Sequence, residues 1–391
     1  MERNIKVSYV LSFLKHSWFW IGIWVFYYLR YTNYSGIGLI ETVMIATMTL
    51  TEIPTGAIGD LVGRKMTLFI ALFLESVGNF IMAYSPNFEI LVFSVFIMSL
   101  GGTMYSGTSD ALAYDSLKAI GKEKDYDKVV ANMNSMQWIA VAVTGIIGGF
   151  LYKVNPSYPF IAAGLFYALG SIATFLLREP AIDTLRFSFT NFLKQNRDGF
   201  KELFKSVETR RIIIFLIGIG SMIILSWEML EGVLGVEFGF DPVGFSILSA
   251  VMYLLSALGS QMTKIVSKLF GYLKGIIIMS VISIISFLPS PYIGIVLGGI
   301  TLATRSIVQV IIQNLSLVIV NRNTESRYRA TAISSFNMLK NMPYFLSAYA
   351  LGVLMDIVTA KMFAFYLGMI FAIWILVFIF AKKSLSIEQT R

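Results

Sequence analysis

Several ionisable side chains stand inside long apolar runs of this sequence. Arg305 begins a polar series with Gln309 and Gln313 at four-residue spacing, so the three side chains share one face of a helix. A guanidinium in apolar surroundings is costly unless it is paired, and it can bind an anion or a carbonyl group. Arg305 and Gln309 are therefore candidate binding residues. The alternative is a buried network that holds helices in register.

A second cation and a pair of acids offer related chemistry. Lys340 shares a helical face with Asn337, and it could bind a ligand or join a buried network. Glu228 and Glu231 are three residues apart and also share a face. Both acids are candidates for binding or coupling, although we expect Glu231 close enough to the end of its apolar run to be solvated.

Glu52 and Glu75 are carboxyl groups within two further apolar runs. Either could carry a proton, because burial raises the pKa of a carboxyl toward neutrality. Glu52 is a candidate for coupling or for packing. For Glu75 we expect a structural partner or a lateral contact.

An aromatic series at helical spacing lies near the N-terminus. Trp24 and Tyr28 are its candidate binding residues, and Trp20, Tyr27 and Tyr31 complete it. Such a surface could stack against a flat or amphiphilic molecule, or against a cation. Aromatic residues also mark membrane interfaces without any ligand, which is the alternative interpretation.

Composition shows what must hold these residues in place. The 391 residues are 56% hydrophobic and 14% charged, with a mean hydropathy of +0.73, whereas roughly 25% of residues are charged in a soluble domain. Most of the chain must therefore lie in lipid, where a spanning helix takes about 20 residues. Polar punctuation predicts twelve spans: 13–33, 38–58, 66–84, 89–112, 131–152, 158–177, 212–232, 243–264, 272–288, 292–318, 330–354 and 361–381.

The formal charge of +8 is distributed on one side of these spans. Of 31 Lys and Arg residues, 26 lie at the termini or in alternate loops. The positive-inside rule then places both termini in the cytoplasm of a cell-membrane protein. This distribution argues against a nucleic-acid partner, and lipids and a small molecule are the expected partners.

The residue types exclude several chemistries. The absence of Cys removes thiolate catalysis and thiolate metal sites, and His16 is the only histidine. We expect His16 at the cytoplasmic start of the first span. No metal site, cofactor or enzymatic activity is expected, because neither a ligand cluster nor a nucleophile and base pair can be assembled.

A basic stretch divides the chain. Residues 178–211 interrupt the apolar pattern, and their Phe and Leu residues recur near helical spacing with Lys and Arg between them. We predict a cytoplasmic linker with an amphipathic helix on the membrane surface. It separates an N-terminal six-helix bundle, residues 1–177, from a C-terminal one, residues 212–391.

A glycine-spaced charged tract lies between the second and third spans. It is expected to form the turn between them, and it contains Gly56, Asp60, Gly63, Arg64 and Lys65. The tract resembles the cytoplasmic signature of the major facilitator superfamily, G-x-x-x-D-R-x-G-R-R/K, with Leu61 in place of a basic residue. Residues 259–268 stand where a second, degenerate copy would lie.

The fourth span strengthens this resemblance. Residues 106–117, with Glu52-Ile-Pro-Thr-Gly, look like the drug-efflux branch of the superfamily. In relatives an acid at this position meets the arginine of the signature, which implies that Arg64 lies within about 4 Å of Asp115, or alternatively of Asp110. The resemblance implies that this cluster acts as a conformational latch.

Glycines in the fifth span match part of another pattern. Gly145, Gly148 and Gly149 partly reproduce the antiporter signature that ends G-P-x-x-G-G, with Gly145 in place of the proline. The resemblance implies export. Close helix packing by small residues is the alternative.

The resemblance as a whole implies twelve helices in two bundles and transport by alternating access. We expect a monomer that exports an amphiphilic or drug-like molecule in exchange for protons. The alternatives are an uptake symporter or facilitator for an anionic metabolite, favoured by Arg305 and Lys340, and a sensor or lipid-moving protein without a solute cycle.

Overall fold

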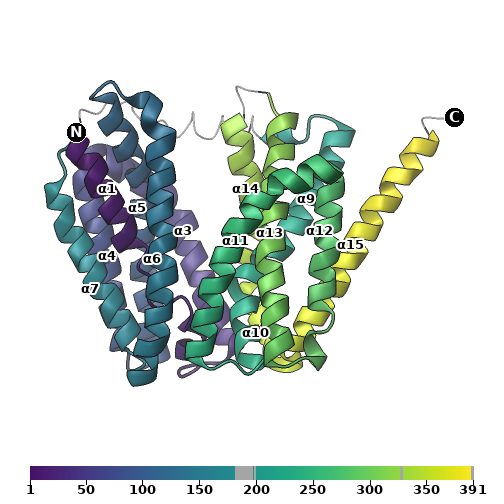
Figure 1. Cartoon of the computed structure of the whole chain (residues 1–391), viewed down its shortest axis with the longest axis horizontal. Helices are drawn as coiled ribbons and strands as arrows, with labels where there is room; N and C mark the ends of the chain where they lie inside the picture. Colours follow the sequence, from purple (N-terminus) through teal and green to yellow (C-terminus); the bar gives the residue numbers. More distant parts are fainter. Residues whose placement is uncertain (181–196, 198–199, 326–328, 389–391) are drawn as a thin grey trace. The chain divides into compact units, whose positions relative to one another are not determined.

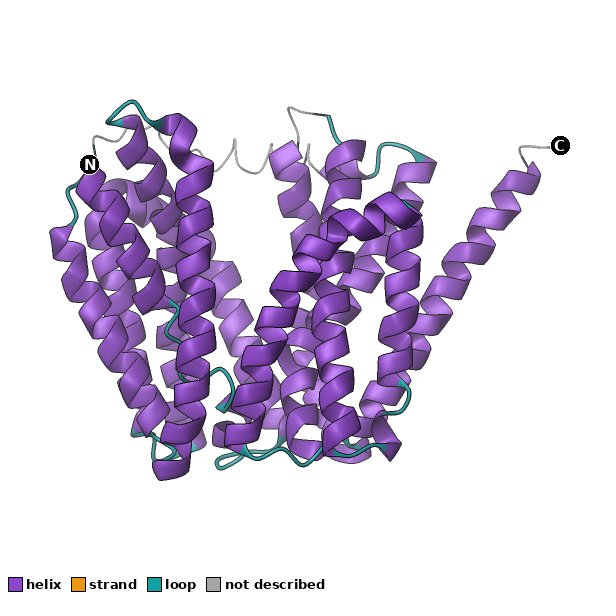
Figure 2. Cartoon of the chain, viewed as in Figure 1, coloured by secondary structure: helices purple, strands orange, loops and turns teal. Residues whose placement is uncertain are grey.

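The computed structural model describes residues 1–180, 197, 200–325 and 329–388, without the side chains of residues 52–61, 330 and 381–388. Within these ranges every regular element is helical (Figures 1 and 2). Eleven described helical segments are long and apolar enough to cross a membrane, by length and composition alone. The predicted all-helical membrane fold is confirmed.

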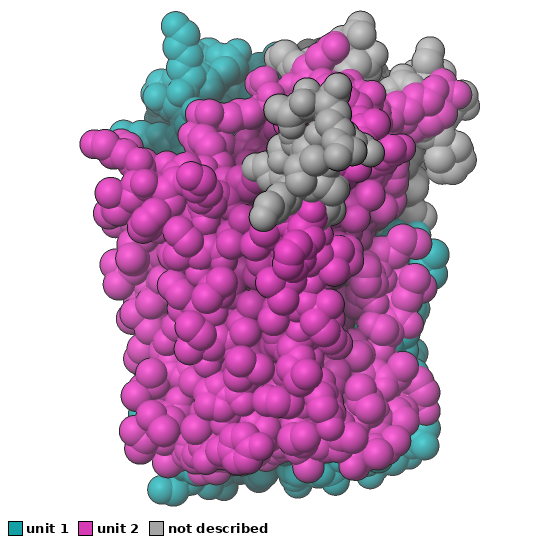
Figure 3. All heavy atoms as spheres, turned by 90° about the vertical axis from the view of Figure 1, so that its right-hand side faces the viewer, with its two compact units in different colours: residues 1–187, 241–250 teal, residues 188–240, 251–391 magenta. Residues whose placement is uncertain are grey.

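The chain forms two compact units (Figure 3), one of residues 1–187 with 241–250 and the other of residues 188–240 with 251–391. In unit 1, α4 packs along α5 and α7, while α1 packs against α5, α6 and α7. The helices of unit 1 are α1 (Glu2–Lys15), α2 (Trp24–Tyr28), α3 (Tyr34–Val62), α4 (Arg64–Ala83), α5 (Phe88–Lys118), α6 (Tyr126–Val154) and α7 (Tyr158–Ala173).

In unit 2, α12 packs along α13, and α9 packs along α14. A π-helical segment, Ser226–Leu230, joins α9 to α10 within one continuous helix. The helices of this part of the chain are α9 (Val207–Leu225), α10 (Glu231–Glu237), α11 (Pro242–Phe270), α12 (Tyr272–Phe287), α13 (Ile295–Asn323), α14 (Arg329–Val358) and α15 (Ala360–Glu388). Asp241 and the first residues of α11, 242–250, group with unit 1.

The predicted first span is wrong in its bounds and its continuity. The chain is helical over Glu2–Lys15 and again over Trp24–Tyr28, with irregular turns between. His16 therefore lies just beyond the end of α1, where its Nδ1 is 2.8 Å from the carbonyl oxygen of Ser12. It does not begin a helix. The aromatic series is also not one helical stripe, because Trp20 precedes α2.

Glycines explain how the irregular stretch is accommodated. A Cβ at Gly148 of α6 would overlap the carbonyl oxygen of Phe19, and one at Gly145 would lie 2.9 Å from the Ile21 side chain. Gly149 packs in the same way against Ser246, at the start of α11. Irregular backbone is tolerated at membrane depth only where protein covers it. The three glycines thus supply close packing, the alternative raised for them from the sequence.

The turn predicted around the charged tract is also wrong in extent. Helix α3 continues to Val62, and Gly63 alone, with φ of +94°, separates it from α4. In the second half, residues 259–268 lie inside α11. The junction there is Gly271, with φ of +75°, before α12. A single glycine in the left-handed region turns the chain in both places, because a Cβ would disfavour that conformation.

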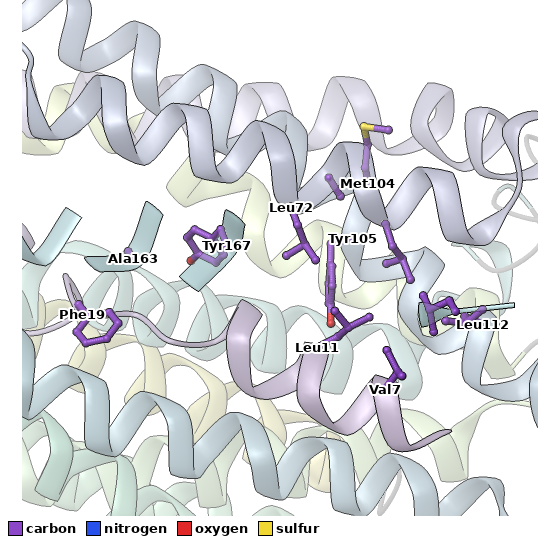
Figure 4. Packing of buried hydrophobic residues seen from close by; sticks show 12 residues of the cluster. Val7, Leu11, Phe19, Leu72, Met104, Tyr105, Leu112, Ala163 and Tyr167 are labelled. Carbon is purple, nitrogen blue, oxygen red and sulfur yellow. The ribbon is translucent and has the colours of Figure 1, made fainter. Parts of the chain in front are cut away.

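An apolar cluster forms the core of unit 1 (Figure 4). It gathers Leu11 of α1, Leu72 of α4, Tyr105 of α5 and Tyr167 of α7, together with Phe19 of the irregular stretch. The break in the first span therefore lies inside the packed core. Most of the predicted linker helix lies outside the described residues.

Gly148→Ala should lower the thermal unfolding temperature of the detergent-solubilised protein. The free energy of unfolding should fall by roughly 1–3 kcal/mol, because the added methyl group meets the fixed carbonyl of Phe19. Gly107→Ala in α5 is the matched control, since no atom lies within 4 Å of its Cβ position. That variant should be neutral or slightly stabilised by helix propensity. Equal unfolding temperatures for the two variants would contradict this packing role.

Candidate functional site

A buried polar cluster lies in unit 2 around Glu231. The Gln309 Nε2 donates to Glu231 Oε1 at 2.9 Å and contacts the Ser226 hydroxyl at 3.1 Å. That hydroxyl donates to the same carboxylate oxygen at 3.0 Å. The Glu231 side chain is therefore held by neutral donors. The expectation that Glu231 is solvated is wrong, because only 4% of the residue is exposed.

The π-helical segment brings these groups together. The backbone N–H of Glu231 bonds the carbonyl of Ser226, five residues earlier. The side chains of Ser226 and Glu231 are also hydrogen-bonded, so a backbone and a side-chain hydrogen bond both join the two ends of this wide turn. Glu228, inside the segment, is only partly buried. Segments of this kind occur frequently at functional sites.

Arg305 lies on α13, one turn before Gln309, and is completely buried. Its guanidinium lies 4.3 Å from the centroid of the Phe287 ring, and Nη2 contacts the Thr301 hydroxyl at 3.4 Å. Nε and Nη1 have no hydrogen-bond partner among the described residues. A direct partner that is anionic or a carbonyl was expected, and the observed contacts are a hydroxyl and a ring face. No direct ion pair joins Arg305 to Glu231.

Lys340 of α14 is buried in the same unit, 6% exposed. Its aliphatic stem packs against Gly220 of α9, where a Cβ would lie 2.5 Å from Cγ. Lys340 also lines a small apolar pocket, whose other polar side chains are Gln313 and Ser316. Asn337 is partly buried on the same helix.

The remaining binding candidates lie in unit 1. Tyr28 is buried, and its ring contacts that of Trp24 edge to face, with centroids 5.7 Å apart. Tyr27 of α2 donates to the carbonyl of Met82 in α4, and Tyr31 donates to that of Ser85 just beyond α4, so both hydrogen bonds hold this part of the chain against α4. The side chain of Glu52 lies outside the described residues.

The expected contact between Arg64, the first residue of α4, and Asp115 is present. Arg64 Nε lies 3.5 Å from Asp115 Oδ2 of α5, while Asp110 is exposed. Lys65 Nζ donates to the carbonyl of Phe175 at 3.1 Å. The side chains of residues 52–61, which include Asp60, are not among those that the structure describes.

Sequence analysis missed Glu179, which caps α4. Its carboxylate accepts the backbone N–H groups of Arg64 and Lys65, at 2.6 and 2.9 Å. Glu237 does the same at the start of α15, accepting from Ala360 and Lys361 at 2.8 Å each. These acids satisfy helix-terminal donors and complement the helix dipole. They come from distant segments, so helix-start patterns could not reveal them.

Sequence analysis also missed the partner of Glu75. Lys15 Nζ lies 2.9 Å from Glu75 Oε2, and both side chains are largely buried, 12% and 4% exposed. Glu75 thus has the structural partner that was one of its expected roles. Lys15 lies near the predicted start of the first span, where a lysine is ordinarily solvated, so the sequence pattern gives no sign of this buried ion pair.

Comparison with known proteins places this arrangement in a family. The model of the Major Facilitator Superfamily matches residues 7–348. The chain belongs to this superfamily. It is a multi-pass membrane transporter and not an enzyme, since the family and the curated relatives are transporters.

Two curated superfamily relatives are drug-resistance proteins. Multidrug resistance protein 1 of Bacillus subtilis is 27% identical over 217 residues, which is 52% of each chain. Quinolone resistance protein NorA of Staphylococcus aureus is 27% identical over 151 residues, 38% of each chain. The matched segments thus span about half the length of these relatives, or less.

Solved superfamily structures share the fold over almost the whole chain. The nucleoside transporter NupG has a TM-score of 0.77 at 17% identity, covering 96% of this chain and 97% of its own. A POT family transporter in complex with 5-aminolevulinic acid has a TM-score of 0.75 at 13% identity, covering 96% and 95%. At these identities the likeness shows the fold alone.

Arg305→Ala should lower transport or substrate binding by roughly tenfold, because a buried guanidinium with free donors contributes a charge-assisted hydrogen bond. Arg30→Ala is the control, since that guanidinium lies over the rings of Tyr27 and Tyr31 near the end of the first span. Binding isotherms of both variants provide the comparison. Normal transport by the Arg305 variant would limit this residue to local packing.

Proposed function

We propose that this transporter exports an amphiphilic, drug-like molecule in exchange for protons. The observation that carries the proposal is the Glu231 cluster, a carboxyl group buried at membrane depth whose hydrogen-bond donors among the described residues are the neutral groups of Ser226 and Gln309. A carboxyl without a direct cationic partner can gain and lose a proton without breaking an ion pair. Acids at such depth mark proton and substrate pathways.

The drug-resistance relatives support this substrate class, as does the aromatic surface of the first span. Trp24 and Tyr28 form an edge-to-face pair in which Trp24 is partly exposed, and such an aromatic surface suits a flat or amphiphilic molecule. Gly145, Gly148 and Gly149 agree with an exporter through their partial likeness to the antiporter pattern. No G-x-x-x-x-G-K-S/T motif occurs in the sequence, so an ion gradient is the proposed energy source.

The latch is the proposed control of the conformational cycle. Arg64 joins α4 to Asp115 of α5 through its side chain, and its backbone N–H binds Glu179. Because one residue links three segments, loss of its side chain would alter the balance between conformations. We further propose a monomer in the cell membrane, with both termini in the cytoplasm.

Uptake of an anionic metabolite is the second candidate. The specific observation in its favour is Arg305, whose Nε and Nη1 have no partner within the described part of the chain. A carboxylate could accept from both, as planar guanidinium groups favour two parallel hydrogen bonds. Lys340 would add a second positive charge in the same unit.

Everted membrane vesicles separate these functions. Addition of a drug-like substrate should release protons from vesicles that contain the wild-type protein, and Glu231→Gln should abolish that release because the side chain no longer titrates. Glu208→Gln, an exposed acid in the first turn of α9, should behave as wild type. Alkalinisation driven by an organic anion would support uptake instead, and no response to either would exclude both.

The latch has its own test. Arg64→Ala and Asp60→Asn should each reduce substrate flux severalfold while membrane insertion and expression stay normal, because they shift a conformational equilibrium. Lys128→Ala, an exposed lysine at the start of α6, is the control. Flux should be measured in cells or vesicles at matched protein level. Full activity in both latch variants would contradict the proposed control.

A further inference from the structure

An ammonium group is enclosed by aromatic rings in the core of unit 1. Lys15 Nζ lies 5.5 Å from the ring centroid of Tyr167, 5.7 Å from that of Tyr105 and 5.9 Å from that of Trp18. These distances are within the range of about 6 Å for cation–π attraction. The carboxylate of Glu75 completes the enclosure at 2.9 Å. We call these three rings and the carboxylate the cation box.

Further polar groups surround the ammonium in the cation box. Glu75 Oε1, Tyr105 OH and the indole nitrogens of Trp18 and Trp20 are all buried. The Tyr167 hydroxyl interacts with Glu75 and with both indoles. A carboxylate and several aromatic side chains thus converge on one cationic centre.

The cation box lies at the end of a helix. Lys15, His16, Trp18 and Trp20 are partly exposed. Lys15 is the last residue of α1, before the irregular stretch, so displacement of its side chain would not interrupt the helix. The rings of Trp18 and Trp20 are stacked, with centroids 5.6 Å apart and planes at 26°, and they offer a flat surface beside the carboxylate.

We propose that the cation box is a binding site for a flat organic cation and that Lys15 fills it as a tethered competitor. Ring faces and a carboxylate both attract positive charge, and both repel an anion. The ligand's cationic centre would take the place of the Lys15 ammonium beside Glu75. This inference rests on the proposed transport of an amphiphilic solute, and it adds the charge of that solute and a second location, separate from the Glu231 cluster.

The test uses N-methylquinolinium and its neutral relative quinoline as probes, with binding to the purified full-length protein followed by tryptophan fluorescence. The cation should bind more tightly than quinoline. Lys15→Met should tighten binding of the cation by about tenfold, because the competing charge–charge hydrogen bond is gone. Lys6→Met, an exposed lysine on the same helix, should bind as wild type. Glu75→Gln should remove the preference for the cation.

Lys15→Met leaves Glu75 buried without its cation, which can prevent folding. The neutral double variant, Lys15→Met with Glu75→Gln, avoids that problem and should bind both probes equally. An unchanged preference for the cation in the double variant would overturn the proposal, as would a folded Lys15→Met variant that binds no more tightly.

Binding in detergent requires no gradient, so this experiment is independent of transport. Charge-selective binding without drug-driven proton release would refute the exchange mechanism and leave the cation box intact. Drug-driven proton release together with equal binding of N-methylquinolinium and quinoline would refute the cation box and support the exchange mechanism.

Discussion

Lipid offers no hydrogen bonds, and this constraint governs the structure. Any backbone or charged group at membrane depth must find its partner within the protein. In the irregular stretch after α1, backbone groups form hydrogen bonds within turns, such as that from the Ile21 N–H to the Trp18 carbonyl at 3.0 Å. Helix α6 packs over this stretch. The glycine at position 148 makes that cover possible, because its missing Cβ lets the Phe19 carbonyl approach the helix.

The buried charged side chains differ in how completely they are paired within the protein. Lys15 and Glu75 neutralise one another directly, whereas Glu231 relies on neutral donors and Arg305 on a hydroxyl and a ring face. A charge that is incompletely paired costs free energy in the resting protein. That cost can be recovered when a proton or a ligand arrives, which is why incompletely paired groups are the natural places for function in this fold.

Both halves of the chain use the same local devices. A 29-residue helix, α3 in one half and α11 in the other, ends at a glycine with positive φ, and a new helix begins directly after it. A carboxylate brought from a distant segment caps one helix in each unit, Glu179 on α4 and Glu237 on α15. In each case the lysine at the capped end donates to a carbonyl elsewhere. These likenesses are structural and are hardly visible as sequence repetition.

The sequence by itself determined the membrane fold and the approximate positions of eleven of the twelve predicted spans, since these depend on hydropathy. Its resemblance to the superfamily signature named Asp115 as one of two possible partners of Arg64. The sequence could also select Arg305 and Glu231, because charges within apolar runs are conspicuous. Tertiary structure alone decided the break in the first span, the burial of Glu231, and the partners of Glu75 and of the capped helix ends. Those features depend on which distant groups approach one another, and a periodic pattern along one segment carries no information about that.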